Sequence, residues 1–178
     1  MEGKTQEPVV TDYVKTILIS QFEAALAMLK QCVQACPPEH YEGKIANDTF
    51  RTIAYHTLFW TDLYLSPGDE HAFELRELNH RGGDDRVLAS SPGLTRDETL
   101  SYVEICRQKL VDTLAEETPE ILAGRSGISR FSFSRGELHL YNLRHIQHHA
   151  GALSAYLRRV DPSLKDSKAL SWVRMGWR

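Results

Sequence analysis

The sequence predicts an all-α protein, a four-helix bundle with long irregular connections that forms a single domain over residues 1–178. Three observations lead to this prediction. Four stretches repeat apolar residues at three- and four-residue spacing, two of them open with capping boxes, and no two stretches show the alternation typical of paired strands. Four amphipathic helices in a chain of 178 residues can bury one sizeable core.

The first two predicted helices are bounded by proline and turn signals. The first spans about residues 9–36 and ends at the proline pair 37–38, because proline cannot continue a helix. Asn47 or Asp48 can cap the second, which runs to about residue 65 and stops at the Ser-Pro-Gly turn signal that follows.

The last two predicted helices begin at capping boxes, in which a hydroxyl residue precedes a glutamate by three positions. Thr95 opens the third helix, which stops before Pro119, and Ser134 opens the fourth, which runs to about residue 160. Residues 66–94 read as a long connection with one short helical turn around 73–78. A second irregular stretch leads from Pro119 to Ser134.

The overall charge and hydrophobicity exclude two classes of partner. A net charge of −3 and a pI near 6.2 give no basic surface for nucleic acid, and no apolar run approaches the roughly 20 residues that cross a bilayer. The first ten residues lack the apolar centre of a signal peptide, so we expect a cytoplasmic protein. Its three cysteines form no CxxC pair and are expected to be reduced thiols.

The fourth helix carries a cluster of histidines in the stretch RHIQHHAGAL, residues 144–153. At about 100° per residue, with His145 at zero, the apolar stripe of this helix centres near +40° and also includes His149. Two imidazoles one turn apart on one face can bind a single metal ion. His56 lies in the apolar stripe of the second helix and can supply a third nitrogen across the bundle.

Other interpretations of these histidines remain open from spacing alone. A buried histidine is more often a hydrogen-bonded core residue than a ligand. His148 lies on the shoulder of the stripe, at about −60°, and could replace His149 as the partner of His145. The remaining histidines, His40, His71, His80 and His139, are expected at the surface. The three tryptophans are expected to be packing residues.

Two segments resemble the DinB-like (damage-inducible) proteins. The segment GELHLYNLRHIQHHAGALSAYLRR, residues 136–159, resembles the last bundle helix of that family, and HTLFWTDLYL, residues 56–65, is similar to its first metal-ligand region. The resemblance extends over about residues 10–160. It implies up-down-down-up helix connectivity and a divalent metal bound by His56, His145 and His149. Ala152 stands where the family usually has glutamine, a difference that concerns packing.

The resemblance also directs the expected function. Three neutral imidazoles leave coordination positions open, as in a catalytic metal site. We expect zinc or nickel, with iron or manganese as alternatives, in a thiol transferase or hydrolase whose small-molecule substrate includes a low-molecular-weight thiol. A metal-binding stress-response protein without catalysis is the alternative. The family also implies a homodimer. The sequence designates no catalytic residue, no other cofactor and no particular substrate.

Overall fold

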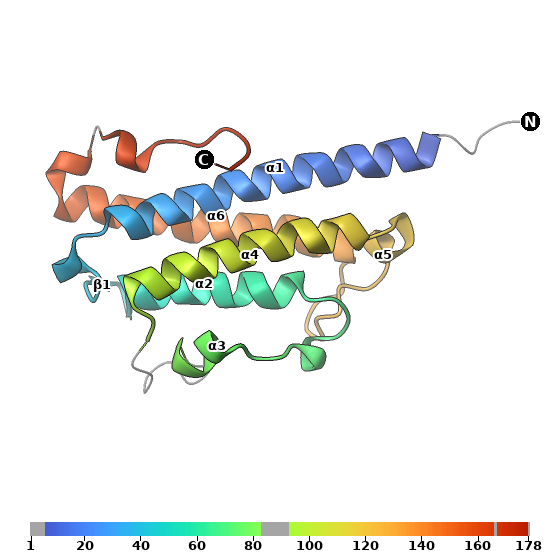
Figure 1. The fold of residues 1–178 in the computed structure, drawn as a ribbon, viewed down its shortest axis with the longest axis horizontal. Helices are drawn as coiled ribbons and strands as arrows, with labels where there is room; N and C mark the ends of the chain where they lie inside the picture. The colour runs from blue at the N-terminus through green and yellow to red at the C-terminus, as the bar shows by residue number, and fades with distance from the viewer. Residues whose placement is uncertain (1–5, 83–92, 166, 178) are drawn as a thin grey trace, which may run out of the picture.

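Four long helices make up most of the chain. The computed structural model describes residues 6–82, 93–165 and 167–177, and this part is mostly helical with one two-stranded sheet, in agreement with the all-α prediction (Figure 1). The long helices are α1 (Gln6–Ala35), α2 (Phe50–Leu65), α4 (Arg96–Glu116) and α6 (Arg135–Val160).

The long helices lie side by side around one apolar core. Helices α1 and α2 each pack against both α4 and α6. In Figure 1, α1 and α6 run from right to left, whereas α2 and α4 run from left to right. Fully buried side chains from all four helices fill the space between them, among them Phe22, Leu58, Leu110 and Leu153. No helix in the described part of the chain is both long and apolar enough to cross a bilayer.

Short elements occupy the connections, and the sequence analysis missed several of them. A hairpin of β1 (Lys44–Ile45) and β2 (Asp48–Thr49) precedes α2, so the cap of that helix is Thr49 rather than the expected Asn47 or Asp48. The other short elements are η1 (Pro38–His40), η2 (Glu70–Ala72), α3 (Glu77–Gly82), α5 (Pro119–Ala123), η4 (Pro162–Leu164) and η5 (Lys168–Leu170).

The described part of the connection before α4 contains two short elements, where the sequence predicted one turn around residues 73–78. Residues 70–72 and 77–82 are helical instead, and residues 83–92 of the predicted connection lie outside the described part. Both capping boxes are confirmed: Thr95 and Ser134 each accept a hydrogen bond from the backbone of the glutamate three residues on.

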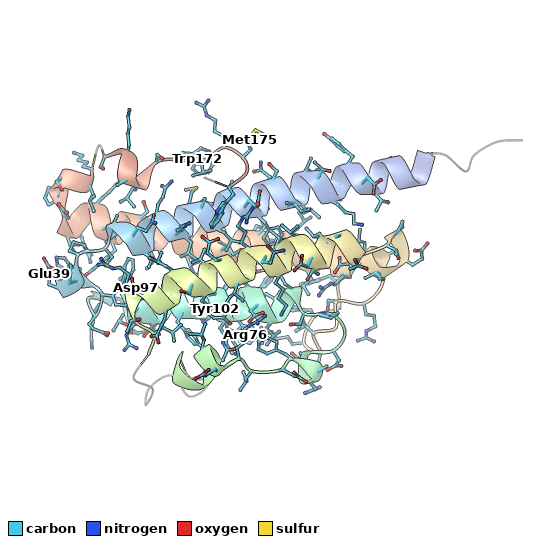
Figure 2. The ribbon with its side chains drawn as sticks, in the orientation of Figure 1. Glu39, Arg76, Asp97, Tyr102, Trp172 and Met175 are labelled. Atoms are coloured by element: carbon cyan, nitrogen blue, oxygen red, sulfur yellow. The ribbon has the colours of Figure 1, made fainter. Side chains whose placement is uncertain are left out.

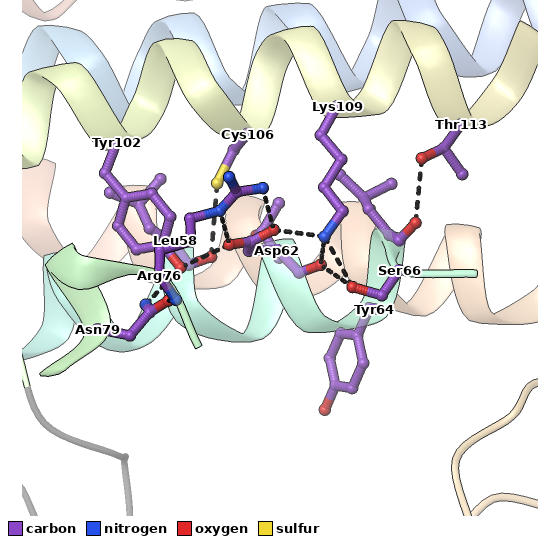
Figure 3. Close-up of polar contacts among 12 residues, drawn as sticks. Leu58, Asp62, Tyr64, Ser66, Arg76, Asn79, Tyr102, Cys106, Lys109 and Thr113 are labelled. Carbon is purple, nitrogen blue, oxygen red and sulfur yellow. Dashed lines mark hydrogen bonds and ion pairs between the residues drawn. The ribbon is translucent and has the colours of Figure 1, made fainter. Parts of the chain in front are cut away.

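A buried carboxylate, Asp62, joins α2 to α4 and to the connection that follows α2 (Figure 3). Its side chain is fully buried, and Lys109 Nζ of α4 donates to its Oδ1 at 2.5 Å. Arg76 Nε donates to Oδ2 at 2.8 Å, and the Tyr102 hydroxyl donates to the same oxygen at 3.0 Å. Asn79 then donates to Tyr102 at 2.8 Å, so the start of α3 is attached to α4 as well.

A second buried carboxylate, Glu117 at the C-terminal cap of α4, binds two residues of α6. Arg135 Nε donates to Glu117 Oε1 at 2.6 Å, and the same guanidinium donates to the Tyr64 and Leu65 carbonyls at the end of α2. The other Glu117 oxygen lies 2.6 Å from His139 Nε2. The expectation that His139 is a surface residue is therefore wrong, because its ring is fully buried and paired with this carboxylate.

The three cysteine thiols are buried, whereas one tryptophan is exposed. Burial raises the pKa of the Cys32 thiol to about 12 and that of Cys36 to about 11, and all three cysteines are free thiols as expected. The tryptophan prediction is wrong for Trp172, which is 68% exposed on the segment that lies along α1 (Figure 2). Val173 of that segment turns inward, onto Ala24 and Ala27.

We predict that Asp62→Ala lowers the free energy of unfolding by about 3 kcal/mol, because it leaves Lys109 and Arg76 without their shared buried partner. Burial raises the pKa of Asp62, but the hydrogen bonds from Arg76 and Lys109 outweigh this effect and leave the pKa below its ordinary value. The stability that Asp62 contributes is therefore present above about pH 4 and is lost as the pH falls through the folded-state pKa.

Urea unfolding at several pH values measures this effect. The difference between the parent and Asp62→Ala should be full at pH 7 and should shrink below about pH 4. The control is Glu104→Ala, which removes a half-exposed ion pair with Lys30 and should cost less than about 1 kcal/mol. Equal losses in the two variants, or a difference that does not change with pH, would contradict the assigned role of Asp62.

Candidate metal centre

The three histidines singled out in the sequence lie together where α2 packs against α6. His56 comes from α2, and His145 and His149 come from consecutive turns of α6. All three side chains are half-buried, so the group lies at the boundary between the core and solvent. Spacing of four residues on α6 places two rings on one face, and the packing of the two helices supplies the third.

The distances between these rings suit a shared ion. His56 Nε2 lies 3.2 Å from His145 Nε2, and one nitrogen from each of the three rings lies within 4.8 Å of the others. Two nitrogens bound to one tetrahedral metal at about 2.0–2.1 Å are about 3.3 Å apart. The pair from α2 and α6 is therefore already at the separation that a metal requires. The three histidines could hold a metal ion.

The structure separates this group from the other histidines. His148 is exposed, and although its ring lies 5.0 Å from that of His149, it is not a member of the three-histidine group. His40 lies 3.3 Å from the Tyr156 hydroxyl, and His71 is exposed as expected. Among the described residues, His56, His145 and His149 form the one group of three or more histidine, cysteine, aspartate or glutamate side chains that could share a metal ion.

Aromatic side chains border the group on one side. The ring of Trp60, one turn after His56, meets that histidine edge to face, with 6.4 Å between the ring centroids. Tyr64 meets His145 in the same way, with 6.3 Å between the centroids. The centre of the Tyr64 ring also lies 6.1 Å from that of Phe131 and 5.7 Å from that of Tyr141. The sequence analysis missed this arrangement, although three aromatic residues at 131, 133 and 141 beside a histidine-rich helix were a visible signal.

Comparisons with protein-family models, with characterised proteins and with solved structures find no match to this chain.

We predict that His149→Ala abolishes binding of one divalent ion per chain, because two imidazoles from different helices cannot hold the ion as three do. His148→Ala should bind the ion as the parent does, since His148 is exposed and outside the group. Elemental analysis of protein purified without an affinity tag for metals measures both. Metal lost from the His148 variant but kept in the His149 variant would reverse the assignment.

Proposed function

We propose that this protein is a DinB-like metal-dependent enzyme that binds one divalent ion through His56, His145 and His149. The convergence of three imidazoles from two helices is the observation that carries the proposal. The reaction we propose is transfer of a low-molecular-weight thiol or a hydrolysis. The metal we propose is zinc or nickel, since imidazole nitrogen suits both.

The arrangement of the helices supports the proposed family. A DinB-like bundle with up-down-down-up connectivity requires that the first and last helices run opposite to the two between them. The directions of α1, α2, α4 and α6 in Figure 1 agree with this requirement. The resemblance of residues 56–65 and 136–159 to the family's ligand regions falls on the two helices that carry the histidines.

The character of the ligands supports catalysis over a purely structural role. Neutral imidazoles leave the charge of the ion uncompensated, and three of them leave a position open for substrate. A divalent ion held there would supply Lewis acidity, which makes hydroxide or thiolate available near neutral pH. The three histidines are half-buried, so part of the group faces solvent and part is covered by the protein.

We predict that a chelator at pH 7.5 lowers the melting temperature of the purified protein, because an ion bound by the folded state alone stabilises it. The variant with His56, His145 and His149 all replaced by alanine should show no response to the chelator. Metal-dependent transfer of a small thiol to an electrophile should disappear in the same variant. A response to the chelator in the triple variant would place the metal elsewhere. If the metal-loaded parent neither transfers thiols nor catalyses hydrolysis, a non-catalytic metal-binding role is favoured.

We also propose that the protein is a homodimer. Val10, Tyr13 and Ile17 lie on α1 at helical spacing and are 58%, 66% and 43% exposed, which leaves an apolar stripe on its N-terminal half. Light scattering at tens of micromolar should give twice the chain mass, and Tyr13→Glu should shift the mass toward that of one chain because it places a charge in the stripe. A monomeric mass for the parent would reject the dimer.

A further inference from the structure

A cavity of about 820 Å³ lies at the end of the bundle where α2 and α4 both finish and α5 begins (Figure 1). Four segments line it: the connection after α2, the last turns of α4, α5 with the loop behind it, and the start of α6. Its volume lies within the range of small-molecule sites, about 300–1,000 Å³. The three histidines do not line it, so it is a candidate binding site separate from the metal centre.

Two irregular connections meet on one side of the cavity and form its wall. Gly127 has φ +80°, and a Cβ there would overlap the carbonyl oxygen of Gly68, so the close approach of the two connections requires glycine at position 127. Both glycines line the cavity, and Pro67 and Ile121 add apolar surface beside them. A ligand with an apolar body therefore has a surface to pack against.

The innermost cations of the lining are already paired. All three N–H donors of Lys109 are taken, two by Asp62 and one by Ser66. Arg135 donates to Glu117 and to the last carbonyls of α2. Because each of these cations has its own carboxylate partner, neither is available to neutralise further negative charge around the cavity.

The outer part of the lining carries more negative than positive charge. Asp69, Asp112 and Glu116 line the cavity and are exposed, and no lysine or arginine in the described part of the chain pairs with any of them. Among the described lining residues, Arg125 is the one exposed cation. Three carboxylates against one guanidinium give this opening a negative potential, which attracts a cationic ligand.

Two helix ends add to this negative potential. The C-terminal end of a helix dipole is negative, and neither α2 nor α4 has a basic residue in its last turn. The N-terminus of α6 also lies here, but Glu137 of its capping box offsets the positive end. Asp112 and Glu116 are four residues apart on α4, a spacing at which like charges destabilise a helix. A bound cation would relieve these repulsions.

We propose that this cavity binds a small organic ammonium ion, whose charged nitrogen lies among Asp69, Asp112 and Glu116 and whose apolar body packs on Pro67 and Ile121. An ammonium group donates charge-assisted hydrogen bonds to carboxylates, and these are stronger than bonds between neutral groups. The inference goes beyond the proposed function, because it assigns a second site and the class of ligand for it. It does not depend on a metal at the histidines.

Fluorine NMR titrations of the full chain, after treatment with a chelator, test the site. The probes are 4-fluorobenzylamine, a cation at pH 7, and the neutral 4-fluorobenzyl alcohol, which has the same ring. We expect the parent to bind the amine about tenfold more tightly than the alcohol, because several partly screened attractions add together. The double variant Asp112→Asn with Glu116→Gln should reduce this preference to less than about twofold. Without ligand it should melt no lower than the parent, since it removes a repulsion.

Glu104→Gln is the matched control, because Glu104 is also an exposed glutamate of α4 but does not line the cavity. It should keep the tenfold preference. Ile121→Lys places a positive charge in the lining and should weaken binding of the amine at least tenfold. Leu75→Lys adds the same charge at an exposed apolar residue outside the lining and should bind the amine as the parent does. If the double variant does not fold, this second pair decides.

Absence of amine binding at millimolar concentration, equal binding of the two probes to the parent, or a preference that survives the double substitution would overturn the proposal. Loss of the preference when His56, His145 and His149 are all replaced by alanine would also overturn it, because the probe would then lie at the histidines. A parent that binds no metal but prefers the amine would refute the metal centre and leave the ammonium site supported.

Discussion

A carboxylate buried in a helical core has to be paired with cations, and two such groups determine how the helices of this protein meet. Asp62 holds α2 against α4, and Glu117 holds the end of α4 against α6 through Arg135. Because Arg135 also binds the last carbonyls of α2, these pairings join all three helices near one end. Arg135 thereby links the start of α6 to the end of α2, the two helices that carry the three histidines.

Much of the helical structure follows from local signals. Thr95 and Ser134 mark the starts of α4 and α6 correctly, because a capping box depends on four consecutive residues and little else. The same kind of signal was present for α5, where Thr118 caps and Pro119 takes the first helical position. The hairpin before α2 was not predictable in this way, since each strand has two residues and its turn places Ala46 at φ 55°, a conformation that alanine rarely adopts.

The candidate site likewise has a part that the sequence predicts and a part that depends on the packing of distant segments. His145 and His149 could be placed on one face from spacing alone, and the meeting with His56 required the packing of two helices. His139 was misplaced because its partner, Glu117, lies 22 residues earlier at the end of another helix, which the periodicity of α6 does not contain. The cavity at the end of α2 and α4 could not be predicted from the sequence, since it depends on contacts between two irregular connections.

The burial of the cysteines has a consequence for a protein proposed to handle thiols and a thiophilic metal. A thiol with a pKa of about 12 is ionised in roughly one molecule in 10⁵ at pH 7, and only the thiolate binds metal or attacks an electrophile. The chain's own cysteine thiols therefore neither compete with imidazole for the ion nor become targets of the reactive compounds that such an enzyme would meet. A reagent reaches Cys32 or Cys106 only when α1 or α4 opens. The alkylation rate of these cysteines therefore reports how often the core opens.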